Sequence, residues 1–128
     1  MTDQVTPVDP PQLATSPAFA QGMIVPSRRV VYVGGQNGID GEGKLLTGLG
    51  AQTGQALRNV KAVLAAAGSG PEHVAKLTIY LTAGVDPTEA YAASAAEWST
   101  RTAVTVVTVQ LSRPGVLVEI EAVAAIPD

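Results

Sequence analysis

The run from residue 111 to residue 124 constrains the fold most, because a Pro-Gly turn leads there into a β-prone segment that carries two carboxylates. In a strand, one face carries the apolar side chains of Val118, Ile120, Ala122 and Ala124. The other face carries the carboxylates of Glu119 and Glu121 together with Val123. Two like charges on one face repel each other and resist burial. The run therefore predicts a strand with one face against a core, and the other open to water, to a cationic partner or to a polar cleft where proton transfer can occur.

The rest of the chain predicts four more strands and two helices, in the order β-β-α-β-α-β-β. Strands are expected at about 19–25, 29–33, 73–82 and 103–110, and helices at 51–67 and 86–98. Asp86 is the expected N-cap of the second helix, with Pro87 in its first turn. The predicted fold class is α+β, with one mixed sheet and two helices packed on one face. Residues 1–17 contain four prolines and predict a flexible N-terminal arm, which leaves 18–128 as a single domain.

The composition excludes several function classes. Cysteine is absent and His73 is the only histidine, so a thiol nucleophile, a histidine-based triad and a zinc site of several histidines are ruled out within one chain, and no metal site is expected. The net charge is −3 and the 8 basic residues are scattered, which argues against nucleic acid as a partner. No apolar run reaches membrane-spanning length and no signal pattern begins the chain, so no membrane partner is expected and the cytoplasm is the predicted location.

The strand at 103–110 predicts self-association. Its valines point to both faces, at positions 104, 106, 107 and 109, so both faces should be covered. Two helices can cover only one face of the sheet. The other face is therefore expected to meet another subunit.

Four segments, in this order and spacing, resemble the RidA/YjgF family: Phe-Ala-Gln-Gly at 19–22, Val-Tyr-Val-Gly-Gly-Gln at 31–36, the helical run 51–68, and Val-Glu-Ile-Glu-Ala at 118–122. The resemblance implies a chorismate-mutase-like homotrimer with three clefts between subunits. It also implies hydrolysis of enamines and imines derived from amino acids, with release of ammonia and a 2-keto acid. The substrate would be an anionic imino acid, and no cofactor is implied.

The resemblance also implies site residues, some of which depart from the family's pattern. Glu119 is retained as the catalytic carboxylate, and Gly35 keeps a backbone position that can approach a ligand closely. Phe19 stands where a tyrosine is expected and Tyr91 where an asparagine is expected, and both are assigned to substrate binding with Ala103. Ala103 replaces the arginine that would grip the substrate carboxylate. Arg101 is then either a surface charge or a relocated catalytic anchor for that carboxylate.

These departures leave two functions open. Glu119 and the glycine-rich segment favour an imine deaminase, whereas Ala103 favours a trimeric protein that binds a small carboxylate or metabolite without turnover. Ribonuclease activity, attached to some relatives, is disfavoured by the acidic charge. A basic side chain within reach of Glu119 across a subunit boundary would distinguish catalysis from binding.

Overall fold

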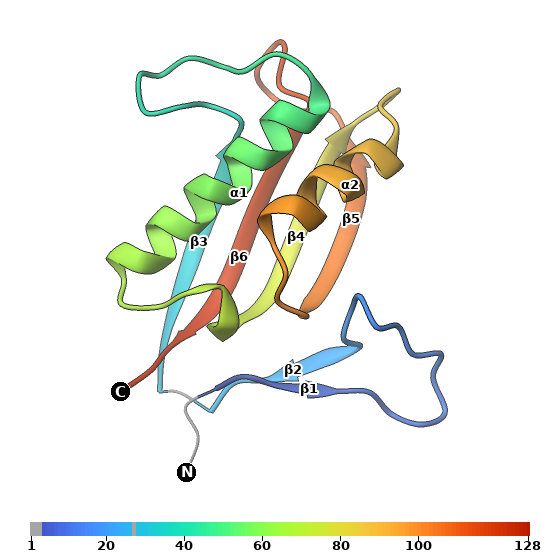
Figure 1. Cartoon of the computed structure of the whole chain (residues 1–128), viewed down its shortest axis with the longest axis vertical. Coiled ribbons are helices and arrows are strands. Elements are labelled where there is room, and N and C mark those ends of the chain that lie inside the picture. Colours follow the sequence, from blue (N-terminus) through green and yellow to red (C-terminus); the bar gives the residue numbers. More distant parts are fainter. Residues whose placement is uncertain (1–3, 27) are drawn as a thin grey trace.

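The computed structural model of the chain describes residues 4–26 and 28–128. Its elements, in chain order, are β1 (Thr6–Val8), β2 (Gly22–Ile24), β3 (Arg29–Asn37), α1 (Leu49–Ala66), the short 3-10 helix η1 (Pro71–His73), β4 (Val74–Thr82), α2 (Pro87–Glu97), β5 (Ala103–Val109) and β6 (Val118–Ile126). Figure 1 shows both α-helices on the same side of one curved sheet, with the β1–β2 hairpin lying beyond one end of it. None of the described helices is long and apolar enough to cross a membrane.

The main sheet has the strand order β3-β6-β4-β5. β6 pairs antiparallel with both β3 and β4, while β5 runs parallel to β4 on the outer edge. The parallel pair follows from α2, which carries the chain back across the sheet between β4 and β5. The predicted α+β class, with a mixed sheet and two helices on one face, is confirmed.

The N-terminal segment differs from the sequence-based expectation. β2 lies within the expected strand 19–25, but it pairs with β1 and stays outside the main sheet. β1 was not expected because Pro7 lies in its middle, and proline is confined to edge positions of sheets. Part of the expected arm is therefore a strand of a hairpin. That residues 18–128 form a domain without this arm stays a prediction, and residues 1–3 lie outside the described residues.

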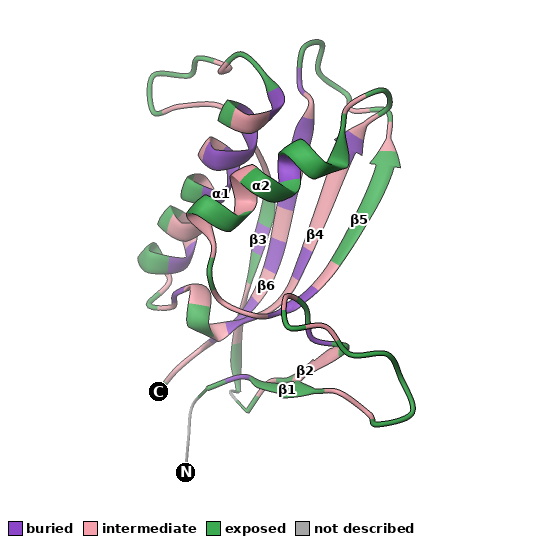
Figure 2. Ribbon diagram, turned by 45° about the vertical axis from the view of Figure 1, so that its right-hand side comes forward, coloured by how far each residue is buried: buried purple, intermediate pink, exposed green. Residues whose placement is uncertain are grey.

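The core lies between the sheet and α1. The predicted alternation of β6 is confirmed, because Val118, Ile120, Ala122 and Ala124 are buried whereas Glu119, Glu121 and Val123 are only partly covered. Leu57, Val60 and Leu64 from α1 are buried against this apolar face. Figure 2 shows the buried positions along β6 and α1, whereas β5 is exposed along most of its length.

Helix α2 packs less closely than α1. Asp86 caps it as predicted, since the Asp86 carboxylate accepts a hydrogen bond from the backbone N–H of Thr88 at 2.9 Å. Ala90 is its only buried residue. The helix is fixed to α1 by Glu97, which pairs with Arg58 at 2.6 Å and with Lys61 at 3.4 Å. Space therefore remains between α2 and strands β4 and β5.

A buried glutamine joins the loops at one end of the sheet. The amide nitrogen of Gln52 donates to the carbonyls of Leu46 and Gly115, both at 3.0 Å, and its oxygen accepts from the N–H of Leu117 at 2.8 Å. A Cβ on Gly38 would lie 2.4 Å from the Cα of Gln52, so a larger residue does not fit there. Gln52 thus fixes the chain after β3 and before β6, the two strands that carry Gly35 and Glu119.

Candidate functional site

Glu119 lies against the backbone of Gly35. A β-bulge between Val33 and Gln36 places Gly34 and Gly35 opposite the middle of β6. A Cβ on Gly35 would lie 2.6 Å from Oε2 of Glu119, whereas one on Gly34 would meet nothing within 4 Å. The Glu119 side chain therefore occupies the space that the absent Gly35 side chain leaves free.

The surroundings of Glu119 are polar and acidic. A shallow cavity of about 240 Å³ is lined by Glu119 with Tyr80, Val109, Gln110, Leu111 and Ser112. Tyr80, which is paired with Glu119 across the strands, donates its hydroxyl to Glu121. This hydrogen bond is the largest cause that raises the pKa of Tyr80 above its ordinary value, followed by burial and by the charges of Glu121 and Glu119. None of the ion pairs among the described residues involves Glu119 or Glu121.

Sequence reasoning missed the Tyr80–Glu121 contact. The period-2 pattern placed Tyr80 on the polar face of its strand, but the register between β4 and β6 is needed to bring it beside both carboxylates.

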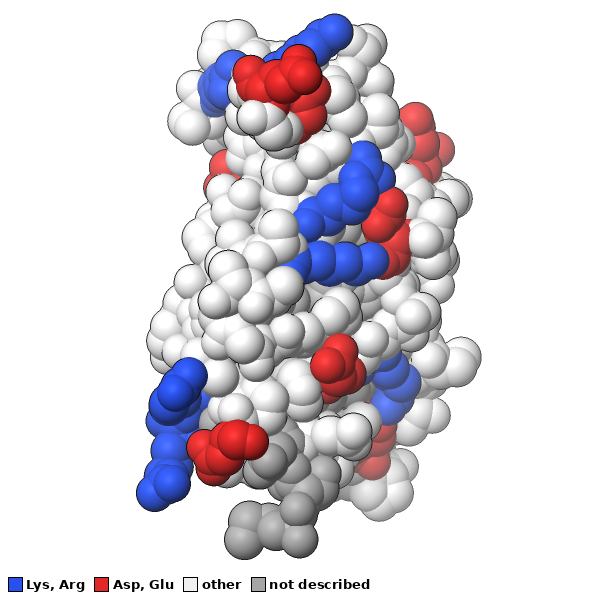
Figure 3. Space-filling view, turned by 60° about the vertical axis from the view of Figure 1, so that its left-hand side comes forward, with Lys and Arg blue, Asp and Glu red and all other residues white. Residues whose placement is uncertain are grey.

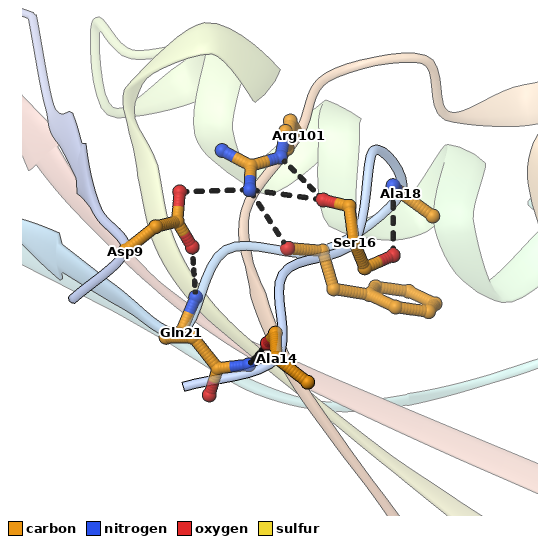
Figure 4. Close-up of polar contacts among 7 residues, drawn as sticks. Asp9, Ala14, Ser16, Ala18, Gln21 and Arg101 are labelled. Atoms are coloured by element: carbon orange, nitrogen blue, oxygen red, sulfur yellow. Dashed lines mark hydrogen bonds and ion pairs between the residues drawn. The ribbon is translucent and has the colours of Figure 1, made fainter. Parts of the chain in front are cut away.

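Arg101 is held by the N-terminal segment rather than by the acidic face. Its Nη2 pairs with Oδ2 of Asp9 at 2.8 Å and donates to the carbonyls of Ser16 and Phe19, both at 3.0 Å, while Nε donates to the Ser16 carbonyl at 3.2 Å. Figure 4 shows Nε and Nη2 of Arg101 facing these acceptors while the third nitrogen points away from them, and it shows Asp9 also accepting from the N–H of Gln21. Most of the hydrogen-bonding capacity of Arg101 is thus used to fasten the hairpin to the start of β5.

Phe19 and Tyr91 form an aromatic pair at the β5 edge. Their ring centroids are 6.0 Å apart and the rings meet edge to face. Both are exposed, and with Val106 they mark the opening of a cavity of about 660 Å³ that lies between α2 and the strands β4 and β5. Arg101 also lines this cavity, whereas Glu119, Gly35 and Ala103 do not.

The main sheet separates the six expected site residues within one chain. The cavity behind Phe19 is lined by Leu77, Ile79 and Leu81, on the helix-covered face, while Glu119 pairs with Tyr80 on the opposite face. Ala103 is buried at the start of β5 and pairs with Lys76, four residues before Tyr80 along β4. A site that unites Phe19 and Tyr91 with Glu119 and Gly35 therefore needs two copies of the chain.

The distribution of charged side chains does not point to a further site. Figure 3 shows Lys and Arg side chains lying beside Asp and Glu on the face that it draws, without a large patch of one sign. The described residues bring together no group of three or more histidine, cysteine, aspartate or glutamate side chains that would hold a metal ion.

Comparisons with known proteins match this architecture. The model of the Endoribonuclease L-PSP family matches residues 11–126. The mitochondrial protein mmf1 of Schizosaccharomyces pombe is 34% identical over 125 residues, which cover 93% of this chain and 75% of mmf1. YyfB of Yersinia pestis, from the conserved Rid protein family, is 29% identical with a TM-score of 0.85 over 95% of this chain and 98% of its own. TdcF of E. coli, solved with bound serine, is 26% identical with a TM-score of 0.69 over 88% of this chain and 90% of its own. The chain belongs to the Endoribonuclease L-PSP family, the group of RidA and YjgF proteins.

Proposed function

We propose that this protein hydrolyses the C=N bond of small enamines or imines in a cleft between two copies of the chain. The observation that carries the proposal is the Glu119 carboxylate, which lies against the Gly35 backbone on the open face of the sheet and has no cationic partner among the described residues. An unpaired carboxylate beside a small polar cavity is suited to orient a water molecule and accept its proton.

The reaction needs only water and the protein. An enamine first tautomerises to its imine. Water held by Glu119 adds to the carbon of the protonated imine while its proton passes to the carboxylate, which gives a neutral carbinolamine. Glu119 returns this proton to the nitrogen, and ammonia leaves. As the C=O bond of the keto product forms, the carboxylate accepts the proton of the hydroxyl group and passes it to the departing ammonia. TdcF holds serine, which supports a site of amino-acid size in this family.

A homotrimer would complete the cleft. Val106 and Val107 are 54% and 37% exposed on opposite faces of β5, and Tyr32 on β3 is 77% exposed. Large apolar side chains left open on an edge strand favour burial against another subunit. The open edge of one protomer would place Phe19 and Tyr91 near Glu119 of the next. A stable monomer in sedimentation at micromolar concentration would contradict this assembly.

Binding without turnover is the second candidate function. It is favoured by the engagement of Arg101 with Asp9 and two backbone carbonyls, and by the buried methyl group of Ala103 at the position expected for arginine. Since Ala103 carries no charge and the Nε and Nη2 groups of Arg101 are already bonded, an anionic substrate would meet Glu119 with little compensating positive charge. The cytoplasm remains the proposed location, although the fission yeast relative is a mitochondrial protein.

The deciding experiment supplies imines from amino acids through an amino-acid oxidase and follows their hydrolysis with and without the protein. We expect acceleration that is lost in Glu119→Gln and kept in Glu121→Gln, which removes the neighbouring charge. If the unmodified protein does not accelerate hydrolysis but binds the keto acid in calorimetry, the binding function replaces the deaminase. If Ala103→Arg then creates turnover, the missing arginine is the reason.

A further inference from the structure

The cavity beneath α2 exists because the helix presents small side chains to the sheet. Ala90 and Ser94 line it from α2, opposite Ile79 of β4 and Val104 of β5. Alanine and serine are too short to reach the strands once α2 is held against α1 by the ion pairs of Glu97. A volume of about 660 Å³ thus remains where a closely packed core would be expected.

The interior of this cavity is largely apolar. Its walls carry branched aliphatic side chains, namely Leu57, Leu77, Ile79, Leu81, Val104 and Val106. The hydroxyls of Ser94 and Thr102 donate to backbone carbonyls at 2.8 and 2.9 Å, and the hydroxyl of Thr53 and the indole N–H of Trp98 are buried within the wall. The surface that is open to a bound group therefore offers mainly hydrophobic contact.

Charge is confined to the opening of the cavity. Among the described residues of the lining, Arg101 alone is charged, and its Nη2 donates to the carbonyl of Phe19 beside the opening. The transfer of a carboxylate or an iminium ion from water into apolar surroundings is costly, so the charged atoms of a substrate stay at the opening. The part of a substrate that can enter the cavity is an uncharged side chain.

We propose that this cavity receives the side chain of the substrate, so that the protein selects imino acids with a large apolar side chain, such as those formed from leucine or phenylalanine. The side chain enters beside the aromatic pair of Phe19 and Tyr91 and packs against Ile79 and Val104. The C=N carbon stays at the opening, where Glu119 of the next protomer would meet it. This selection rests on the proposed hydrolysis in a cleft between two copies of the chain.

Hydrophobic burial determines the size of the expected preference. The imine from leucine has three more side-chain carbons than the imine from alanine, and each buried methylene group favours binding by about fourfold. A ligand the size of serine, which TdcF holds, would leave most of the cavity unfilled. We therefore expect kcat/KM for the imine from leucine to exceed that for the imine from alanine by roughly tenfold or more.

The test measures kcat/KM of the full-length protein for imines that an amino-acid oxidase supplies from alanine, leucine and phenylalanine. Ser94→Phe should lower the ratio of leucine to alanine by roughly tenfold, because the ring fills the cavity. Ala96→Phe is the matched control on the same helix, since Ala96 is exposed and does not line the cavity, and it should keep the ratio. If Ser94→Phe does not fold, Ser94→Leu takes its place with the same expectation.

The affinities for 2-keto acids separate this proposal from the proposed hydrolysis, because the keto product keeps the side chain. In calorimetry, 4-methyl-2-oxopentanoate should bind more tightly than pyruvate, and Ser94→Phe should remove the difference. If this holds while no imine is hydrolysed, the hydrolysis fails and the selection stands. Absence of binding by 4-methyl-2-oxopentanoate, a preference for the smaller side chain, or the same loss in Ala96→Phe would overturn the selection.

Discussion

Arg101 and Asp9 are 92 positions apart in the sequence, yet Nη2 of Arg101 lies 2.8 Å from Oδ2 of Asp9. The pair joins the connection between β1 and β2 to the residue that leads into β5. The same guanidinium bonds to the carbonyl of Phe19, and the N–H of Ala20 donates to the carbonyl of Thr102. Through these contacts, the position of the Phe19 ring at the cavity opening depends on Arg101.

Arg101→Ala should therefore destabilise the protein. Three carbonyl and carboxylate acceptors lose their charged donor, so the free energy of unfolding should fall by about 2 kcal/mol. Urea denaturation at neutral pH measures it. Arg113→Ala, at an exposed turn position, is the control and should change the free energy of unfolding by less than about 0.5 kcal/mol. Unchanged stability in Arg101→Ala would leave Arg101 available as a ligand anchor.

The attachment of the N-terminal hairpin to the rest of the protein should weaken at acid pH. The pKa of Asp9 is lowered from its ordinary value of 3.8, first by the hydrogen bond from the N–H of Gln21 and then by Arg101. Because the folded pKa is depressed, the stabilisation is fully present above the unfolded pKa near 4 and is lost as the pH falls through the lower folded pKa. We expect the amide hydrogen of Gln21 to exchange faster, relative to core amides, at pH values below about 4.

Asp9→Asn should remove this pH dependence, because the amide does not ionise in that range. Glu42→Gln changes an exposed carboxylate of another turn and should leave it intact. Protection of Gln21 that stays constant through the acid range would show that Asp9 does not hold the hairpin.

The local pattern of the sequence was sufficient to predict the main elements. The alternation in β6 and the apolar spacing in α1 each depend on one segment packing against one core, so both are visible without the rest of the chain. The cap at Asp86 is likewise a local interaction. β1 escaped prediction because a strand of three residues with a proline has no periodic signal of its own.

The site was less predictable, because it depends on contacts between distant segments. Arg101 offers the same side chain to a substrate or to Asp9, and only the folded N-terminal segment shows that Asp9 lies within reach. The alanines of α2 predicted a helix correctly, but not that the helix would leave a cavity above β4. The expected site residues lie on two different faces of the sheet. This division depends on the register between strands, which the sequence of one segment does not reveal.

Gly35→Ala should disturb the candidate cleft without unfolding the protein. The added Cβ would lie 2.6 Å from Oε2 of Glu119, so the carboxylate must move, and we expect loss of most imine hydrolysis. Gly34→Ala adds the same methyl group where nothing lies within 4 Å and should keep activity. The test compares the initial rates of imine hydrolysis of the two variants. Circular dichroism checks that both have the same secondary-structure content. Equal activity in the two variants would show that turnover does not depend on the position of the Glu119 carboxylate.

Gln52→Leu should be strongly destabilising. The leucine fits the volume approximately, but the carbonyls of Leu46 and Gly115 and the N–H of Leu117 lose their partner in a largely buried place. We expect the free energy of unfolding to fall by about 3 kcal/mol. Gln55→Leu, three residues along α1, loses only hydrogen bonds to Asn59 and Arg58 and should cost clearly less in the same denaturation series. Similar losses in both variants would show that Gln52 does not fasten these loops.

Thr53 and Thr102 provide a matched test of the unsatisfied groups around the cavity. Both are 1% exposed, but the hydroxyl of Thr102 donates to the carbonyl of Val74 at 2.9 Å, whereas that of Thr53 has no partner among the described residues. Valine keeps the shape of threonine and removes the hydroxyl. Thr53→Val should therefore raise the free energy of unfolding by about 1 kcal/mol, and Thr102→Val should lower it by about 1 kcal/mol or more. Thermal and urea denaturation of the ligand-free protein give both values. If Thr53→Val lowers stability as Thr102→Val does, the Thr53 hydroxyl already has a hydrogen-bond partner.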